Sequence, residues 1–306
     1  MAKGPTRQHY VPQCYLREWA ASDFLFRKTS YLWTFNKGEK KGRKSSITNV
    51  FVEKDLYTLK LKSGEKNYSI EETLATLEGK YAALFKDKIS QRLPLTEDER
   101  ITLRVFVAAM LQRTPRFRDN MQRFHDQLME QMSPDVTPEE RQGLKQEMEN
   151  GHKLNFVQLL PDVAMMLMDM NIAFLCSDGG AKYITSDDPC QVFNPELQWQ
   201  RAYGPDLGQE RVEVYLPLSP EILLCMSRSP LRGYVLRDKT EVEESNRMTV
   251  GHSYKYFIAN SSRARRHWYR RYPLDFFFIL KILRHQASMR WHELKLWYQY
   301  RHVTKR

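Results

Sequence analysis

The sequence has no apolar run of the about 18 residues that a membrane-spanning helix needs. Its apolar stretches, such as 172–176 and 276–280 with five residues each, are far shorter than that, and residues 1–9 lack the apolar core of a signal peptide. These absences predict a cytoplasmic protein without a membrane partner.

Cysteine is scarce, and the four that occur (Cys14, Cys176, Cys190 and Cys225) form no C-x-x-C pair and have no histidine beside them. This spacing argues against a zinc site or a disulfide framework and predicts reduced, mostly buried thiols. The chain also lacks G-x-G-x-x-G, a phosphate-binding P-loop, H-E-x-x-H and G-x-S-x-G. Dinucleotide-binding, P-loop, zinc-peptidase and α/β-hydrolase chemistries therefore have no sequence support.

Positive charge is present in excess and is concentrated at the C-terminal end. The chain of 306 residues has a formal net charge of +11, and residues 263–306 hold twelve Lys/Arg against two acids. Residues 1–262 are therefore nearly neutral, with a net charge of +1. A cationic segment of this kind suits a polyanionic partner.

Aromatic residues alternate with the arginines of this segment, and the combination predicts a nucleic-acid surface, since guanidinium groups bind phosphates and flat rings stack on bases. The residues expected to contact nucleic acid, RNA or DNA, are Arg263, Arg265, Arg266, Trp268, Arg270, Arg271, Arg284, Arg290 and Trp291. Two alternatives stay open. The apolar residues at 276–287 and 294–298 fit helical stripes that could dock on the body, and a basic patch can equally meet an acidic protein or anionic lipid.

The periodicity of the apolar residues predicts an α+β fold: N-terminal strands, a central helical bundle, a C-terminal antiparallel sheet and a basic helical tail. Residues 1–262 are expected to form one domain, with 263–306 as the tail. Capping boxes are expected at Ser69–Glu72 and Thr96–Glu99, and a hairpin is expected over 172–186 around Asp178-Gly179-Gly180. Helices are predicted at 69–88, 96–111, 137–150 and 152–170, and further strands at 31–35, 56–61, 212–216, 221–226 and 254–259.

Several motifs occur in a fixed order along the chain: Gln8-His9-Tyr10-Val11-Pro12-Gln13-Cys14-Tyr15-Leu16-Arg17, Val52–Tyr57, Glu71–Glu78, Gln112-Arg113-Thr114-Pro115, Ile184–Pro189, Leu216–Pro220 and Asn246. Together they resemble an uncharacterised bacterial family, domain of unknown function 4238, over about residues 8–260. The resemblance implies one folded unit and brings no established activity. Cys190 stands where the family has an aliphatic residue, so it is not expected to be a nucleophile.

Polar residues from these motifs are candidates for one site, because motifs far apart in sequence can converge in space. The candidate catalytic residues are His9, Glu53, Glu78, Arg113 and Asp187. Of these, Glu53, Glu78 and Asp187 are the expected ligands of Mg²⁺ or Mn²⁺, and Arg113 would steady a phosphoryl oxygen. Each also has a structural alternative, as a core histidine, a solvated or paired carboxylate, a turn cap or a helix-end arginine.

The leading hypothesis from the sequence is a nucleic-acid-directed enzyme, a metal-assisted nuclease of bacterial defence or toxin type. Its first rival is a non-catalytic nucleic-acid-binding or regulatory protein. The second is an interaction protein whose tail recognises an acidic partner. The sequence does not decide the oligomeric state.

Overall fold

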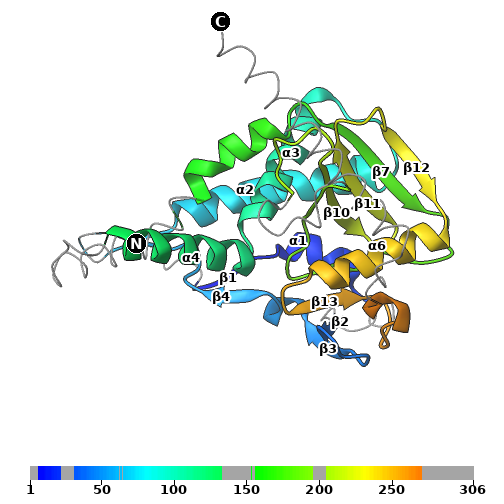
Figure 1. The fold of residues 1–306 in the computed structure, drawn as a ribbon, viewed down its shortest axis with the longest axis horizontal. Helices are drawn as coiled ribbons and strands as arrows, with labels where there is room; N and C mark the ends of the chain where they lie inside the picture. Colours follow the sequence, from blue (N-terminus) through cyan, green and yellow to red (C-terminus); the bar gives the residue numbers. More distant parts are fainter. Residues whose placement is uncertain are drawn as a thin grey trace, which may run out of the picture. The chain divides into compact units, whose positions relative to one another are not determined.

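A computed structural model describes residues 6–21, 31–61, 63, 65–132, 153, 156–195 and 205–270 of the chain. Met1–Tyr269 makes up one compact unit, and within it helices combine with mainly antiparallel sheets, which confirms the α+β class (Figure 1). The helix predicted at 137–150 lies outside the described residues. So do Arg271, Arg284, Arg290 and Trp291 of the tail.

The helical part is built around α3 (Glu97–Gln112), which packs against α2 (Ser69–Leu84). Both partners of the predicted capping box are present, because Thr96 accepts from the amide of Glu99 while the Glu99 carboxylate accepts from the amide of Thr96. α3 is largely buried, and Phe106 stacks on Tyr81 of α2 with ring centroids 3.7 Å apart. The prediction of a central helix is confirmed.

Two details of the helices differ from prediction. The box at Ser69–Glu72 is wrong: Tyr68 precedes the helix, and the Asn67 side chain accepts from the amide of Ser69. α2 continues into a π-helical turn, Phe85–Ile89. Pro115 separates two helices, since it cannot donate the hydrogen bond that would continue α3, and α4 (Pro115–Met132) begins at it.

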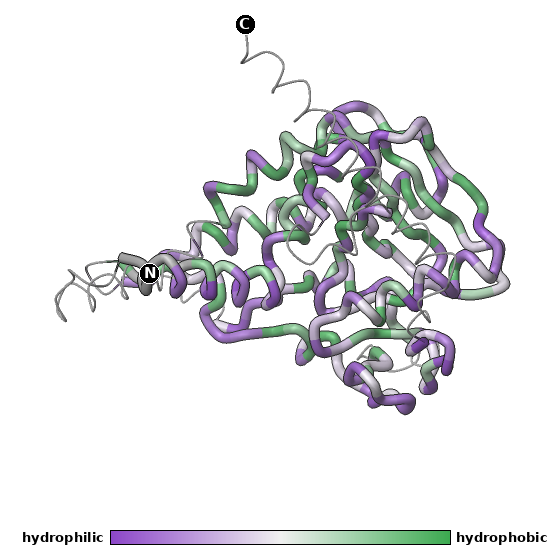
Figure 2. The backbone as a smooth tube through the Cα atoms, viewed as in Figure 1, coloured by the Kyte–Doolittle hydropathy of each residue, from purple (hydrophilic) through white to green (hydrophobic). Residues whose placement is uncertain are grey.

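A five-stranded sheet in the order β12-β7-β11-β10-β9 forms the apolar half of the unit, and green tube follows these strands in Figure 2. Its strands are β12 (Gly233–Arg237), β7 (Asn171–Ser177), β11 (Ile222–Ser227), β10 (Glu213–Ser219) and β9 (Gln191–Phe193). All neighbours are antiparallel except β12 and β7, which are parallel. The expectation of an antiparallel sheet therefore misses one pair.

The predicted hairpin over 172–186 is wrong. β7 pairs with β11 over six registered residues, whereas β8 (Thr185–Ser186) pairs with β13 (Tyr256–Ala259) in another sheet. The physical reason is burial: β7 is apolar on both faces and needs a long apolar partner on each side, and β8 is too short to provide one.

The second sheet has the order β3-β2-β13-β8, with β2 (Tyr31–Asn36) and β3 (Arg43–Ser46) joined as a hairpin. Gly42 turns over the Phe35 ring so closely that a Cβ there would lie 2.7 Å from it. Two short strand pairs complete the unit: β1 (Arg7–His9) with β4 (Val52–Lys54), and β5 (Leu59–Lys60) with β6 (Lys66–Asn67).

The sequence did not predict α6 (Lys239–His252), which runs between the two sheets in Figure 1. Asp238 and Glu241 form a full capping box at its start. The remaining short helices are α1 (Gln13–Leu16) and the 3₁₀ turns Arg17–Trp19, Ile47–Asn49 and Arg266–Tyr269. Across the described residues, no helix has the length and apolarity to cross a membrane.

Candidate functional site

Arg113 is the centre of the predicted cluster and is buried, with a side chain 2% exposed. Its Nη1 donates to Glu78 Oε1 at 2.9 Å and its Nη2 donates to the backbone carbonyl of His9 at 2.7 Å. The guanidinium also lies 5.6 Å from the centre of the Tyr57 ring. Burial alone would lower the pKa of Arg113, but Tyr57 and Glu78 raise it, so the group stays cationic.

Two other candidates, His9 and Glu78, therefore lie beside Arg113, where they are held in structural contacts. The His9 ring lies at hydrogen-bond distance from the Ile47 carbonyl (3.2 Å) and from the Gln13 side chain (3.4 Å). Burial lowers the pKa of His9, and the hydrogen bond to Ile47 opposes the shift only in part. His9 contributes its carbonyl, not its imidazole, to the arginine.

Glu53 extends this cluster toward α4. Its carboxylate forms an ion pair with Arg118, and Arg118 also lies beside Asp119. Asp119 in turn accepts from the Tyr254 hydroxyl at 2.6 Å. The first turns of α4 thus connect β4 to the chain that precedes β13.

Asp187 is buried, and it accepts from three consecutive backbone amides. Its Oδ1 accepts from Tyr254 at 2.8 Å, and its Oδ2 accepts from Lys255 at 2.7 Å and from Tyr256 at 2.9 Å. Burial raises the pKa of Asp187, while these three hydrogen bonds act in the opposite direction. Both carboxylate oxygens are used in fixing the entry to β13.

Asp188 carries a second charge cluster that the sequence did not predict. Its carboxylate is 2.5 Å from Nε of Arg116 and 3.1 Å from Nε2 of His252. Arg116 also donates to the backbone carbonyl of His252 and lies over the Tyr254 ring. The neighbouring Asp-Asp-Pro sequence gave a signal for Asp187 only, since nothing local indicates which distant cation Asp188 meets.

The structure does not bring the expected metal ligands together. Glu53 pairs with Arg118, Glu78 pairs with Arg113, and Asp187 binds backbone amides. Within the described ranges, no three acidic, histidine or cysteine side chains form a group that could hold a metal ion. A shared Mg²⁺ or Mn²⁺ on these three carboxylates stays a prediction from the sequence, and the contacts of the described residues give it no support.

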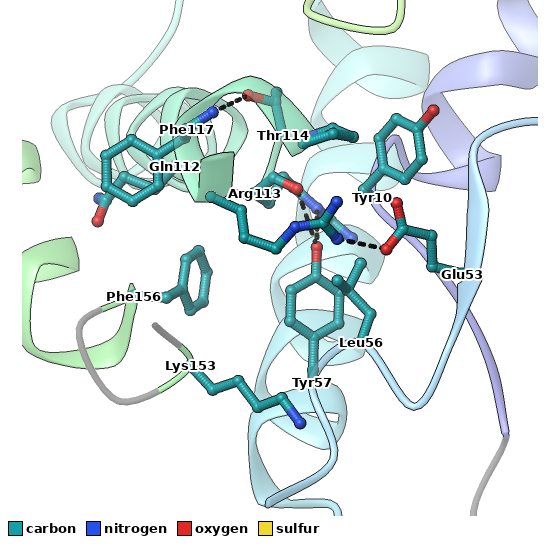
Figure 3. Close-up of a pocket in the computed structure, with 12 residues that line it drawn as sticks. Tyr10, Glu53, Leu56, Tyr57, Gln112, Arg113, Thr114, Phe117, Lys153 and Phe156 are labelled. Atoms are coloured by element: carbon teal, nitrogen blue, oxygen red, sulfur yellow. Dashed lines mark hydrogen bonds and ion pairs between the residues drawn. The ribbon is translucent and has the colours of Figure 1, made fainter. Parts of the chain in front are cut away.

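A small pocket opens beside Arg113, with Glu53, Tyr57 and Phe156 in its wall (Figure 3). In Figure 3 the Tyr57 hydroxyl points toward Arg113, and dashed lines mark the hydrogen bonds between them. The pocket volume of about 30 Å³ is room for one or two waters and too small for a nucleotide. As lined by the described residues, the pocket therefore gives no support to a nucleotide site beside Arg113.

The residues that meet around Arg113 and Asp187 come from the motifs on which the family resemblance rests. A family model described as "Protein of unknown function (DUF4238)" matches residues 7–263. The chain belongs to this family. No match was found among curated proteins or among solved structures. The match confirms the residue range, about 8–260, over which the sequence resembles the family. Within the DUF4238 region, residues of the motifs form the interior contacts described above.

A surface outside these motifs carries the exposed charge. The turn between β2 and β3 is bound to the chain after β13: Ala264 donates to the Lys40 carbonyl, Gly42 donates to the Ser262 carbonyl (both 2.9 Å), and Lys41 bridges Arg263. This brings exposed cations from both segments together, and hydrophilic tube marks the turn in Figure 2. We call the group the cationic surface; its members are Lys40, Lys41, Arg43, Lys44, Arg263 and Arg266.

Two predicted nucleic-acid contacts at the start of the tail have structural roles instead. Trp268 is 5% exposed, and its indole nitrogen donates to Glu243 at 2.5 Å, so its ring cannot stack on a base. Arg265 forms an ion pair with the same carboxylate, which His267 also contacts at 2.6 Å. Residues 263–269 are therefore described as part of the compact unit Met1–Tyr269. Arg263, Arg266 and Arg270 are exposed.

Proposed function

We propose that this protein binds nucleic acid through the cationic surface and the basic segment that follows it. The observation that carries the proposal is the contact between the β2–β3 turn and residues 262–264, which brings the cations of the turn beside Arg263. Glu39 is the only acid between residues 37 and 44, and its carboxylate accepts from the Asn36 amide.

Four members of this surface keep their charge without an acidic partner among the described residues. Lys40, Lys41, Arg263 and Arg266 are exposed and form no ion pair within the described part of the chain. Phosphates of a nucleic-acid backbone are the natural partners of such a surface, because each contact releases condensed counterions. A cytoplasmic location, as expected from the sequence, would give the surface access to RNA and DNA.

The contacts of the candidate carboxylates favour a nucleic-acid-binding protein over a nuclease. The three carboxylates expected to hold a metal are engaged with Arg118, Arg113 and backbone amides. A non-catalytic nucleic-acid-binding protein therefore fits the described residues better than a metal-assisted nuclease. Nuclease activity stays a prediction from the sequence, and incubation of labelled RNA and DNA with Mg²⁺ or Mn²⁺ tests it, with Glu53→Gln as the comparison.

Fluorescence anisotropy with labelled 20-mers of RNA and DNA, over a series of salt concentrations, tests the binding. The surface variant replaces Lys40, Lys41, Arg263 and Arg266 by alanine. The matched control makes the same change at four exposed cations elsewhere: Lys80, Lys86, Arg92 and Arg232. A chain that ends at Arg270 measures the tail without removing the buried Trp268.

Losing four phosphate contacts should reduce the slope of log affinity against log salt by about 3 and weaken binding at least about tenfold at 0.1 M salt. The control, with the same net charge, should keep most of the slope. Equal losses in both four-site variants, or no salt-dependent binding by the full chain, would refute the proposal. Stronger binding to poly-glutamate or to phosphatidylserine vesicles than to RNA or DNA would assign the surface to another partner.

A further inference from the structure

A second, larger pocket lies between α6 and the five-stranded sheet. Its volume is about 270 Å³, close to the lower end of the range for small-molecule sites, about 300–1,000 Å³. Helix–sheet layers normally pack with few voids larger than a water. The gap is therefore large enough to hold a small molecule.

The sheet side of this pocket is formed by residues on one face of neighbouring strands. Leu175 is paired with Leu223, and Gln191 is paired with Tyr215, in the registers of the sheet. The opposite wall comes from α6, where Ser245, Met248 and Thr249 face the gap. The space thus has one wall from the sheet and one wall from the helix.

Tyr183 is one of the lining residues, and its hydroxyl is a buried polar group that lacks a hydrogen-bond partner among the described residues. The residue is 1% exposed, and its hydroxyl is buried and unpaired. Burial raises the pKa of Tyr183, and Arg237 and Glu241 at the pocket act on the phenol electrostatically. The hydroxyl thus stays protonated and can donate.

The other polar groups of the lining are already engaged, so they add little charge. Gln191 donates to Thr249 at 2.8 Å, and Thr249 donates to the Ser245 carbonyl at 3.0 Å. Each charged group of the rim has a partner of opposite sign, since Arg237 pairs with Glu241 and Glu244 pairs with Arg247. A rim of paired charges favours a neutral ligand.

We propose that this pocket binds one small neutral heteroaromatic molecule, of purine size, whose acceptor nitrogen or oxygen takes the hydrogen bond of the Tyr183 phenol. The leucines and tyrosines of the walls contact its faces, and aromatic and apolar walls are how proteins hold flat bases. The site is distinct from the cationic surface, and it stands independently of nucleic-acid binding.

Titration calorimetry of the full chain with adenine and hypoxanthine tests the proposal, with 1-methylindole as a ligand of similar size that has no comparable acceptor. Ser245→Phe fills the gap, and Thr240→Phe places the same ring on the exposed surface of the same helix. We expect saturable binding of a purine by the wild type and by Thr240→Phe, and none by Ser245→Phe. Absence of saturable purine binding by the wild type, or unchanged binding by Ser245→Phe, would overturn the proposal.

Tyr183→Phe removes only the unpaired hydroxyl. Purine affinity should fall about three- to tenfold, while 1-methylindole binding should not change. The unfolding midpoint should stay constant or rise, because no existing hydrogen bond is lost. In the matched variant Tyr15→Phe, which loses hydrogen bonds to Thr185 and Pro217 (both 2.5 Å), it should fall by about 2–6 °C. Purine binding that is insensitive to Tyr183→Phe would refute the role of the phenol.

Discussion

Replacing Glu78 by glutamine removes the negative partner of Arg113 and keeps the length of the side chain. Arg113 is 2% exposed and Glu78 is 25% exposed, so the cation remains shielded from water when its partner is neutralised. Breaking a fully buried ion pair costs about 3–5 kcal/mol. Here the His9 carbonyl still accepts from Arg113 at 2.7 Å, and the glutamine oxygen can accept as well. We therefore expect a smaller loss, about 2 kcal/mol of unfolding free energy.

Urea unfolding of the full chain, followed by tryptophan fluorescence, measures this loss. With a slope of about 3 kcal/mol per M, the midpoint should fall by about 0.7 M. Glu72→Gln is the control, because Glu72 lies on the same helix, is exposed and has no ion pair within the described residues. Its effect should stay within about 0.5 kcal/mol. If the two variants unfold at the same urea concentration, the Arg113–Glu78 pair does not stabilise the fold as argued.

Two further predictions concern the other members of the predicted site. Asp187→Asn places an amide donor against backbone amides that are themselves donors, so it should lower the unfolding free energy by about 2–4 kcal/mol. The control Asp206→Asn changes an exposed turn where a single amide donates, and it should cost less than about 1 kcal/mol. Equal urea midpoints for the two variants would contradict this expectation. Burial lowers the pKa of His9 below 6.5, so the unfolded chain binds the proton before the folded chain does as the pH falls. The stability that neutral His9 contributes is therefore complete above pH 6.5, and it is lost as the pH falls through the pKa of His9 in the folded state. The stability difference between the wild type and His9→Gln should therefore shrink from pH 8 to pH 5, and a constant difference would exclude this titration.

The parts of the fold that the sequence predicted are those with strong local signals. α3 has both a capping box and a nearly continuous apolar surface, and β10 and β11 are apolar strands joined by a short turn. α6 was missed although Asp238 and Glu241 give the same capping signature, because its exposed face is highly polar and only a narrow stripe packs inward. The pairing of β7 with β11 instead of β8 depends on contacts about 50 residues away, which no local pattern contains.

The sequence named the polar candidates of the site but not the partners that they meet. The sequence placed Arg113 and Glu78 in one group of polar candidates without predicting that they pair, and the structure pairs them. Whether a carboxylate faces a metal, an arginine or an amide is decided by the backbone around it. Asp187 illustrates this, since the three amides it binds belong to residues 254–256, which show no sequence relation to it.

The first of the family motifs, residues 8–17, has a physical explanation in the contacts of β1. Gln8 is 0% exposed; its side chain donates to the Thr58 hydroxyl at 3.1 Å and accepts from the amide of Tyr57 at 2.6 Å. The next residue, His9, gives its carbonyl to Arg113. Two neighbouring residues thus attach the first strand to the β4–β5 segment and to the end of α3. Residues with such interior contacts hold the unit together, so activity is better sought where charge and volume are unused: on the cationic surface and in the pocket beneath α6.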